Sequence, residues 1–293
     1  MPPRRVVTLL KVLAVVGSLV VIVVGVLAYL VGSTALASNR ARSDSVALLE
    51  SVRTNANAAQ AALKALPSFD ISSTHPDLAT AKKTADQYAS QLAGYRTTLQ
   101  ADDVKLRADR DRLRNQATGI LALPFRSSLD HERLRADGLL SALQAEDTAL
   151  QIEVDQIKTF SAIFDAESDM IALLNDHLDK QDIKGSIALF PALDGKLKAA
   201  AQAAAGPSTP PQIQKLVAGM QTLSTDLNAF LQAAQRQDSR TVLALEPKVV
   251  ADLTALENFD AKGLESYEQT LLQPYEDRFD SGVRAAGFTP KLT

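Results

Sequence analysis

The hydrophobic and polar positions of this chain form three successive patterns. A continuous apolar run comes first, from Val12 to Val31. Apolar residues then recur every seven positions through the middle of the chain, and a short motif occurs twice in the C-terminal part. Each pattern is typical of helices, so the sequence predicts an all-α protein with an N-terminal membrane helix, long coiled-coil-like helices and a duplicated helical-hairpin bundle.

The apolar run has the properties of a membrane-spanning helix. Val12 to Val31 carries no charge, and about 20 such residues cross the roughly 30 Å hydrocarbon core of a bilayer. The positive charges before it are Arg4, Arg5 and Lys11. The first one after it is Arg40, so the positive-inside rule places the N-terminus in the cytoplasm. We therefore expect a cytoplasmic tail at 1–11, a single-pass signal-anchor at 12–32 and an extracytoplasmic remainder.

A cleaved secretory signal is the alternative for the same segment. Ala35-Leu36-Ala37 precedes Ser38 and fits the small-residue pattern of a cleavage site near Ala37. The apolar run is longer than the roughly 7 to 15 residues of a signal-peptide core, which favours the retained anchor. In both cases the bulk of the chain lies outside the cytoplasm, in the second case as a secreted protein.

A juxtamembrane helix and a loop are expected at 33–75. Apolar residues between Ser38 and Leu66 alternate spacings of three and four, which places them on one helical stripe. The stripe consists of Leu49, Val52, Ala56, Ala59, Leu63 and Leu66. Pro67 ends this helix, and the breaker-rich stretch that follows contains His75.

A seven-residue repeat predicts a long antiparallel helical hairpin at 76–180. The first helix carries it at Leu78, Ala85, Leu92, Leu99, Leu106, Leu113 and Ile120. The second helix carries it at Leu129, Ala136, Leu143, Leu150, Ile157, Phe164, Ile171 and Leu178. Such stripes are seams that pack against another helix of the same chain or of another chain. A short connection at Pro124 makes the two helices antiparallel neighbours. The charged run from Asp102 to Arg114 reads as a solvated face with local ion pairs.

An internal repeat organises 181–259. The matching features, 56 residues apart, are Gln181-Asp182 and Pro191 in the first copy and Gln237-Asp238 and Pro247 in the second. Each copy predicts a helix, a tight Gln-Asp turn and a second helix that the proline interrupts. Together with the end of the preceding helix, the two hairpins supply four helices, which suffice to enclose a bundle core.

The last region, 260–293, is expected to form an amphipathic helix and a tail. Its apolar positions share one helical face: Leu264, Tyr267, Leu271, Tyr275 and Phe279. Gly287 fits the glycine that commonly ends a helix. At helical spacing, aromatic residues belong to a packed core more often than to a ligand pocket.

Composition narrows the chemistry. The chain has no cysteine and no tryptophan, and its formal net charge is −3. A disulfide framework, a thiolate metal site and a cysteine nucleophile are therefore excluded. Charges of both signs are spread along the chain, so we expect no nucleic-acid partner.

No catalytic, cofactor-binding or metal-binding residue is predicted. His75, His131 and His177 lie in different segments, and none has a carboxylate or a second histidine three or four residues away. Asp165, Glu167 and Asp169 alternate by two, which points neighbours apart on a helix and disfavours an oxygen-ligand metal site. P-loop, G-x-S-x-G and G-x-G-x-x-G motifs do not occur.

Two hypotheses of function follow. The first is a membrane-anchored extracytoplasmic scaffold of the cell envelope, without enzymatic activity, that binds lipid through Val12 to Val31 and a protein or a second copy through its heptad seams. The second is a small-molecule-binding bundle that acts through a separate membrane protein. The layout resembles bacterial extracytoplasmic sensor bundles. A transducing receptor of that kind needs a second membrane crossing, and no segment after Val31 is apolar enough to provide one.

Overall fold

The computed structural model describes 78–118, 126–178, 180–259 and 261–289. It also describes helical positions at Arg40, 42–44, 46–47, Glu50 and Thr54. The expected tail at 1–11, the anchor at 12–32, most of 33–75 with His75, and the connection at Pro124 lie outside these residues. Within the described helices, no segment combines the length and the apolar character needed to span a membrane.

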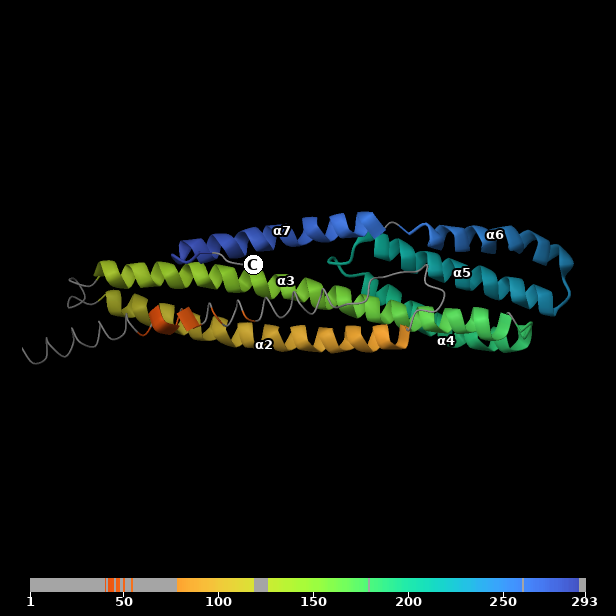
Figure 1. Cartoon of the computed structure of the whole chain (residues 1–293), viewed down its shortest axis with the longest axis horizontal. Coiled ribbons are helices and arrows are strands. Elements are labelled where there is room, and N and C mark those ends of the chain that lie inside the picture. The colour runs from red at the N-terminus through yellow and green to blue at the C-terminus, as the bar shows by residue number, and fades with distance from the viewer. Residues whose placement is uncertain are drawn as a thin grey trace, which may run out of the picture. The chain divides into compact units, whose positions relative to one another are not determined.

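Every regular element in the described part is helical, which confirms the all-α prediction (Figure 1). The elements are α2 (Leu78–Ala117), α3 (Arg126–Ala172), the π-helical turn η2 (Leu173–Leu178), α4 (Ile183–Ala204), α5 (Pro211–Gln235), α6 (Ser239–Glu257) and α7 (Ala261–Ala285). The two heptad patterns thus correspond to α2 and to α3 with η2. The two repeat copies correspond to the hairpin η2–α4 and the hairpin α5–α6.

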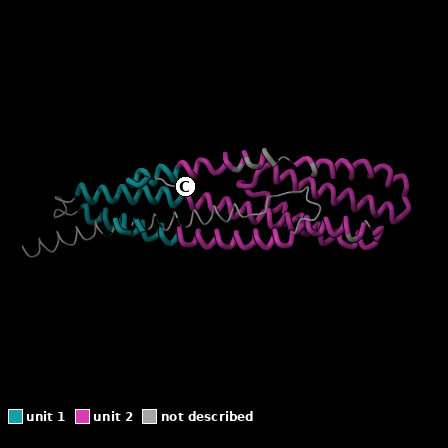
Figure 2. The backbone as a smooth tube through the Cα atoms, viewed as in Figure 1, with its two compact units in different colours: residues 1–54, 100–144, 278–293 teal, residues 55–99, 145–277 magenta. Residues whose placement is uncertain are grey.

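The chain divides into two compact units, and three helices contribute to both of them (Figure 2). Of the described helices, unit 1 contains 100–117 of α2, 126–144 of α3 and the end of α7 from 278 onward. Unit 2 contains 78–99 of α2, the rest of α3, η2, α4, α5, α6 and α7 up to 277.

Heptad leucines build the core of unit 1. Leu106 and Leu113 of α2 and Leu129 and Leu143 of α3 are all buried. Leu113 and Leu129 belong to one buried cluster, and Arg110 of α2 reaches Asp137 of α3, so the two helices lie next to each other here. Burial of each leucine stabilises the unit by about 1.5–3 kcal/mol relative to an exposed side chain.

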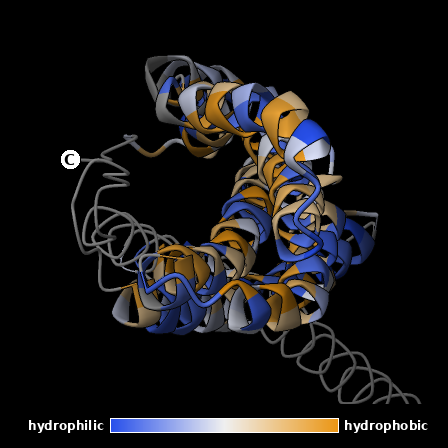
Figure 3. Cartoon of the chain, turned by 90° about the vertical axis from the view of Figure 1, so that its right-hand side faces the viewer, coloured by the Kyte–Doolittle hydropathy of each residue, from blue (hydrophilic) through white to orange (hydrophobic). Residues whose placement is uncertain are grey.

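A larger apolar core fills unit 2, and its helices carry apolar and polar sides (Figure 3). The buried members come from the end of α3, η2, α4 and α5, with Ile163, Leu173, Leu193, Leu197, Ile213 and Leu223 nearly inaccessible. Val249, Leu253 and Leu256 of α6 pack against this core but are only partly buried. The four helices expected from the internal repeat therefore do share one core.

The same turn joins the helices of both repeat copies. Gln181 and Gln237 have φ angles of 59° and 57°, the left-handed conformation that closes many helices. The Asp182 N–H donates to the His177 carbonyl at 2.8 Å, and the Asp238 N–H donates to the Ala233 carbonyl at 3.0 Å. The predicted Gln-Asp turns are therefore present, with matching hydrogen bonds.

The proline of each repeat copy lies inside the second helix, as the sequence predicts. α4 continues through Pro191, and α6 continues through Pro247. A proline removes one backbone donor, and packing of the apolar face against the bundle core can offset that loss.

The expected end of α7 is present. Gly287 has a φ of +78°, its N–H donates to the Arg284 carbonyl at 2.9 Å, and the Phe288 N–H donates to the Val283 carbonyl at 3.1 Å. This pair of hydrogen bonds satisfies carbonyls that the end of a helix leaves free. Phe279 is buried in unit 1, as its position on the apolar face predicts.

Candidate functional site

The two described histidines lie far apart in the sequence and have different surroundings. His131 is exposed in the first turns of α3. His177 lies in η2, and its Nδ1 is 3.0 Å from Asp182 Oδ2 across the turn to α4. The Gly185 N–H donates to Oδ1 of the same carboxylate at 2.9 Å, and this bond, followed by the histidine, lowers the pKa of Asp182. His177 therefore supports a helix cap. Sequence reasoning missed this pair because its members are five residues apart.

The acidic residues of α3 face a lysine of α4. Lys196 Nζ lies 2.8 Å from Asp169 Oδ1 and 3.3 Å from Asp165 Oδ1. Asp165 and Asp169 are four residues apart and share one helical face, while Glu167 points elsewhere, and burial raises its pKa. Among the described residues, no three histidine or carboxylate side chains come together as a metal site.

Partly buried polar contacts hold α2 against α3 in unit 2. Arg96 Nε donates to Asp147 Oδ1 at 3.0 Å, and its Nη1 donates to Gln151 Oε1. The Ser161 hydroxyl donates to Asp86 Oδ1 at 2.5 Å and lowers the pKa of that carboxyl. From one contact to the next, the residue number increases in α2 and decreases in α3. The two helices are therefore antiparallel here.

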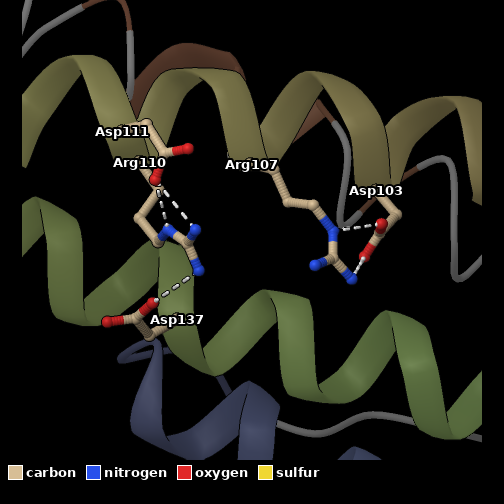
Figure 4. Close-up of polar contacts among 5 residues, drawn as sticks. All are labelled: Asp103, Arg107, Arg110, Asp111 and Asp137. Atoms are coloured by element: carbon tan, nitrogen blue, oxygen red, sulfur yellow. Dashed lines mark hydrogen bonds and ion pairs between the residues drawn. The ribbon is translucent and has the colours of Figure 1, made fainter.

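The charged run of α2 in unit 1 forms the expected ion pairs (Figure 4). Arg107 binds Asp103 four residues earlier, with donor–acceptor distances of 2.5 and 3.1 Å. Arg110 lies between Asp111 of its own helix, at 2.8 Å, and Asp137 of α3, at 3.7 Å. The charged side chains of the run thus pair mainly within α2, and Arg110 also pairs with the neighbouring helix.

In unit 1 the end of α7 packs against α3 through one arginine and two glycines. Arg135 Nε donates to the Ala286 carbonyl at 2.9 Å, its guanidinium lies 5.5 Å from the Phe288 ring centre, and Glu132 accepts from its Nη1. A Cβ added at Gly138 would lie 2.7 Å from the Gly282 carbonyl oxygen, closer than real Cβ atoms approach. The two helices therefore touch backbone to backbone, which only glycine permits.

One carboxyl of unit 2 has a strongly perturbed pKa. Burial, and then the charge of Glu276 on α7, raise the pKa of Glu146 on α3 to about 7. A perturbed carboxyl can act as an acid or a base when it faces a substrate cleft. A hollow of about 640 Å³ lies along α2 between Ala79 and Gln91, and Glu146 is not among the described residues that line it.

The most unusual surface among the described helices belongs to α6. Leu243 is 70% exposed and Val250 is 56% exposed. With Pro247 and Thr254 they follow spacings of four, three and four, so they form one stripe, which we call the α6 stripe. A stripe of this kind is a candidate site for binding another protein.

The other repeat copy provides an internal reference for the α6 stripe. The equivalents of Val250 and Thr254 in α4 are Asp194 and Lys198, which form an exposed ion pair of 2.7 Å. The equivalent of Leu243 is Ile187, which is partly buried against the unit 2 core. The hairpin therefore folds without an exposed apolar stripe, and α6 carries one in addition.

Comparison of this chain with protein-family models, with curated proteins and with solved structures finds no match. Function is therefore inferred from the side chains of this chain. Several described polar groups at partly buried positions join helices to one another, among them Arg96, Lys196 and Arg135. The candidate site is accordingly a protein-binding surface, the α6 stripe.

Proposed function

We propose that this chain is a membrane-anchored, extracytoplasmic helical-bundle protein with a structural, protein-binding role and no catalytic activity. The observation that carries the binding role is the exposure of large apolar side chains on otherwise polar helix surfaces. Besides the α6 stripe, these include Val104 of α2 and Leu134 of α3, at 66% and 56% exposed. Burial of such side chains against a binding partner lowers the free energy of the complex.

The anchored location is supported by the sequence. Val12 to Val31 has the length and the apolar character of a membrane helix, and the lysine and arginine residues flanking it set the orientation.

Cysteine labelling tests location and orientation, because the natural chain has no cysteine. Thr8→Cys and Gln269→Cys place single thiols in the tail and on the exposed side of α7. A membrane-impermeant maleimide added to intact cells should label the Gln269→Cys chain and spare the Thr8→Cys chain. Labelling in the reverse pattern would overturn the orientation. A shortened chain in the medium would favour the cleaved, secreted form.

Photo-crosslinking in membranes tests the binding role. A photoreactive residue at Val104 or Leu134 should join the full chain to one defined protein, and the same residue at exposed Lys158 of α3 should not. Adducts of equal yield at all three positions would contradict a specific partner. A rise in melting temperature with one compound in a metabolite screen would instead favour the small-molecule-binding hypothesis, since about 2.7 kcal/mol is gained at a hundredfold excess over Kd.

A further inference from the structure

We propose that the α6 stripe pairs with the α6 stripe of a second copy of this chain, with the two helices antiparallel. This inference concerns unit 2 alone and does not depend on the membrane anchor or on the partner of Val104 and Leu134. It defines the occupant of the stripe as the same surface of an identical chain.

The spacing of the stripe is self-complementary. Leu243 and Val250 are two helical turns apart, with Pro247 between them. When a second α6 runs in the opposite direction, Leu243 of each copy lies opposite Val250 of the other. One contact is thus made twice about a two-fold axis, as homodimer interfaces require, and four exposed side chains become covered.

Charge distinguishes the antiparallel pair from the parallel one. Arg240 is exposed in the first turn of α6, next to the Asp238 cap. It lies at the positive end of its own helix dipole, where cations are disfavoured. An antiparallel pair places it beside the negative C-terminal end of the other α6. A parallel pair would bring the two copies of Arg240 together.

The position of α6 in the repeat explains why it accepts another helix. α4 buries six residues, and it contacts both η2 and α5. α6 packs on α5, and none of its residues with described burial is fully buried. Terminal units of stacked helical hairpins need a cap for their outer side, and a second copy would supply it.

Disulfide trapping tests the proposed register in the full chain. Chains carrying Leu243→Cys alone and Val250→Cys alone are prepared separately and then mixed under mild oxidation. The antiparallel pair predicts a covalent dimer in the mixture and little dimer in either variant alone, since equivalent positions lie about 10 Å apart along the axis and a disulfide needs Cα atoms within about 7 Å. Covalent dimers that form in each single variant, with no additional dimer in the mixture, would overturn the antiparallel arrangement. Absence of dimers in every combination would overturn the pairing itself.

Sedimentation of the purified full chain in detergent tests the energetics. Leu243→Asp with Val250→Asp should weaken dimerisation on the order of a hundredfold or more, because pairing would bury unpaired carboxylates. The matched control is Lys248→Asp with Ala255→Asp, which places two carboxylates seven residues apart at exposed positions of α6 outside the stripe and should leave the dimer unchanged. Circular dichroism should show equal helix content in both. A monomeric parent chain, or a dimer that persists in the stripe variant, would contradict the proposal.

Discussion

The two repeat copies share a backbone turn but differ in what surrounds it. In the hairpins η2–α4 and α5–α6 a glutamine adopts a left-handed φ, and the following aspartate caps the second helix. Matching hydrogen bonds close both turns. Duplication has thus preserved the local geometry, in which a few backbone angles and one carboxylate determine the result.

The second cap contact is made differently in each copy. In the first copy His177 approaches Asp182, and position 185 is glycine. In the second copy the Thr241 hydroxyl donates to Asp238 Oδ2 at 2.6 Å, and the position equivalent to His177 is Ala233. Each copy therefore supplies one polar group to Oδ2 of its capping aspartate. That group precedes the aspartate in the first copy and follows it in the second.

Packing differs more than capping does. Phe190 of α4 is 4% exposed in the unit 2 core, whereas the equivalent Glu246 of α6 is exposed. The reason is position in the bundle, since α4 lies between two neighbours and α6 packs chiefly on one. The comparison shows that the local sequence determines the turn. Whether a helix face is apolar or polar depends on which helices cover it.

Replacing the buried Phe190 should give the largest difference in stability between the two repeat copies. We expect Phe190→Ala to lower the free energy of unfolding by about 3–5 kcal/mol, because it leaves a cavity in a packed core. Glu246→Ala should change it by less than about 0.5 kcal/mol, as exposed substitutions do. Urea denaturation followed by circular dichroism measures both. Equal losses would mean that the two faces are covered alike.

Acidic pH should change stability through Glu146, outside both copies. Its pKa is raised to about 7, so the folded chain binds more protons than the unfolded chain between the usual glutamate range and neutrality. Stability should therefore fall as pH rises to about 7 and level off above it, on the order of 2 kcal/mol after allowance for partial exposure. Glu146→Gln should abolish that slope in melts at pH 5 and pH 8. An unchanged slope would mean that other titratable groups cause the pH dependence. The cap variants of the two repeat copies should be compared in the Glu146→Gln background.

Exchanging the cap solutions tests whether they are equivalent. Gly185→Thr alone should cost about 1.5 kcal/mol, because its Cβ would lie 2.7 Å from His177 Nδ1 and overlap Asp182. Adding His177→Ala recreates the arrangement of the second copy and should recover at least half of the loss. Thermal melts of the two single variants and the double variant give the coupling. Additive losses would show that the two caps do not use interchangeable contacts.

Periodicity predicted the helices well because burial of one face is what stabilises them. The heptads of α2 and α3, the Gln-Asp turns and the glycine end of α7 were all readable from local spacing. The membrane segment and the role of the chain stay predictions.

Contacts between distant segments were beyond sequence reasoning. Lys196 lies between Asp165 and Asp169 because two helices meet there, and spacing within either helix gives no sign of it. The close approach of Gly138 and Gly282 likewise joins residues that are far apart in the chain. The exposure of Leu243 follows from which neighbours α6 has, and no pattern within α6 reveals that.

The smallest effect concerns the turn glutamines, and it tests the feature that the copies share. Gln181→Gly and Gln237→Gly should each stabilise the chain by about 0.5 kcal/mol, because a left-handed φ costs more with a side chain than with glycine, partly offset by the entropy of glycine in the unfolded chain. Gly287→Gln is the matched reversal at φ +78° and should destabilise by a similar amount. Chemical denaturation with both glutamines replaced should show additive gains, since the turns lie in different hairpins. A gain in one copy alone would mean that the shared φ is held by different forces in the two turns.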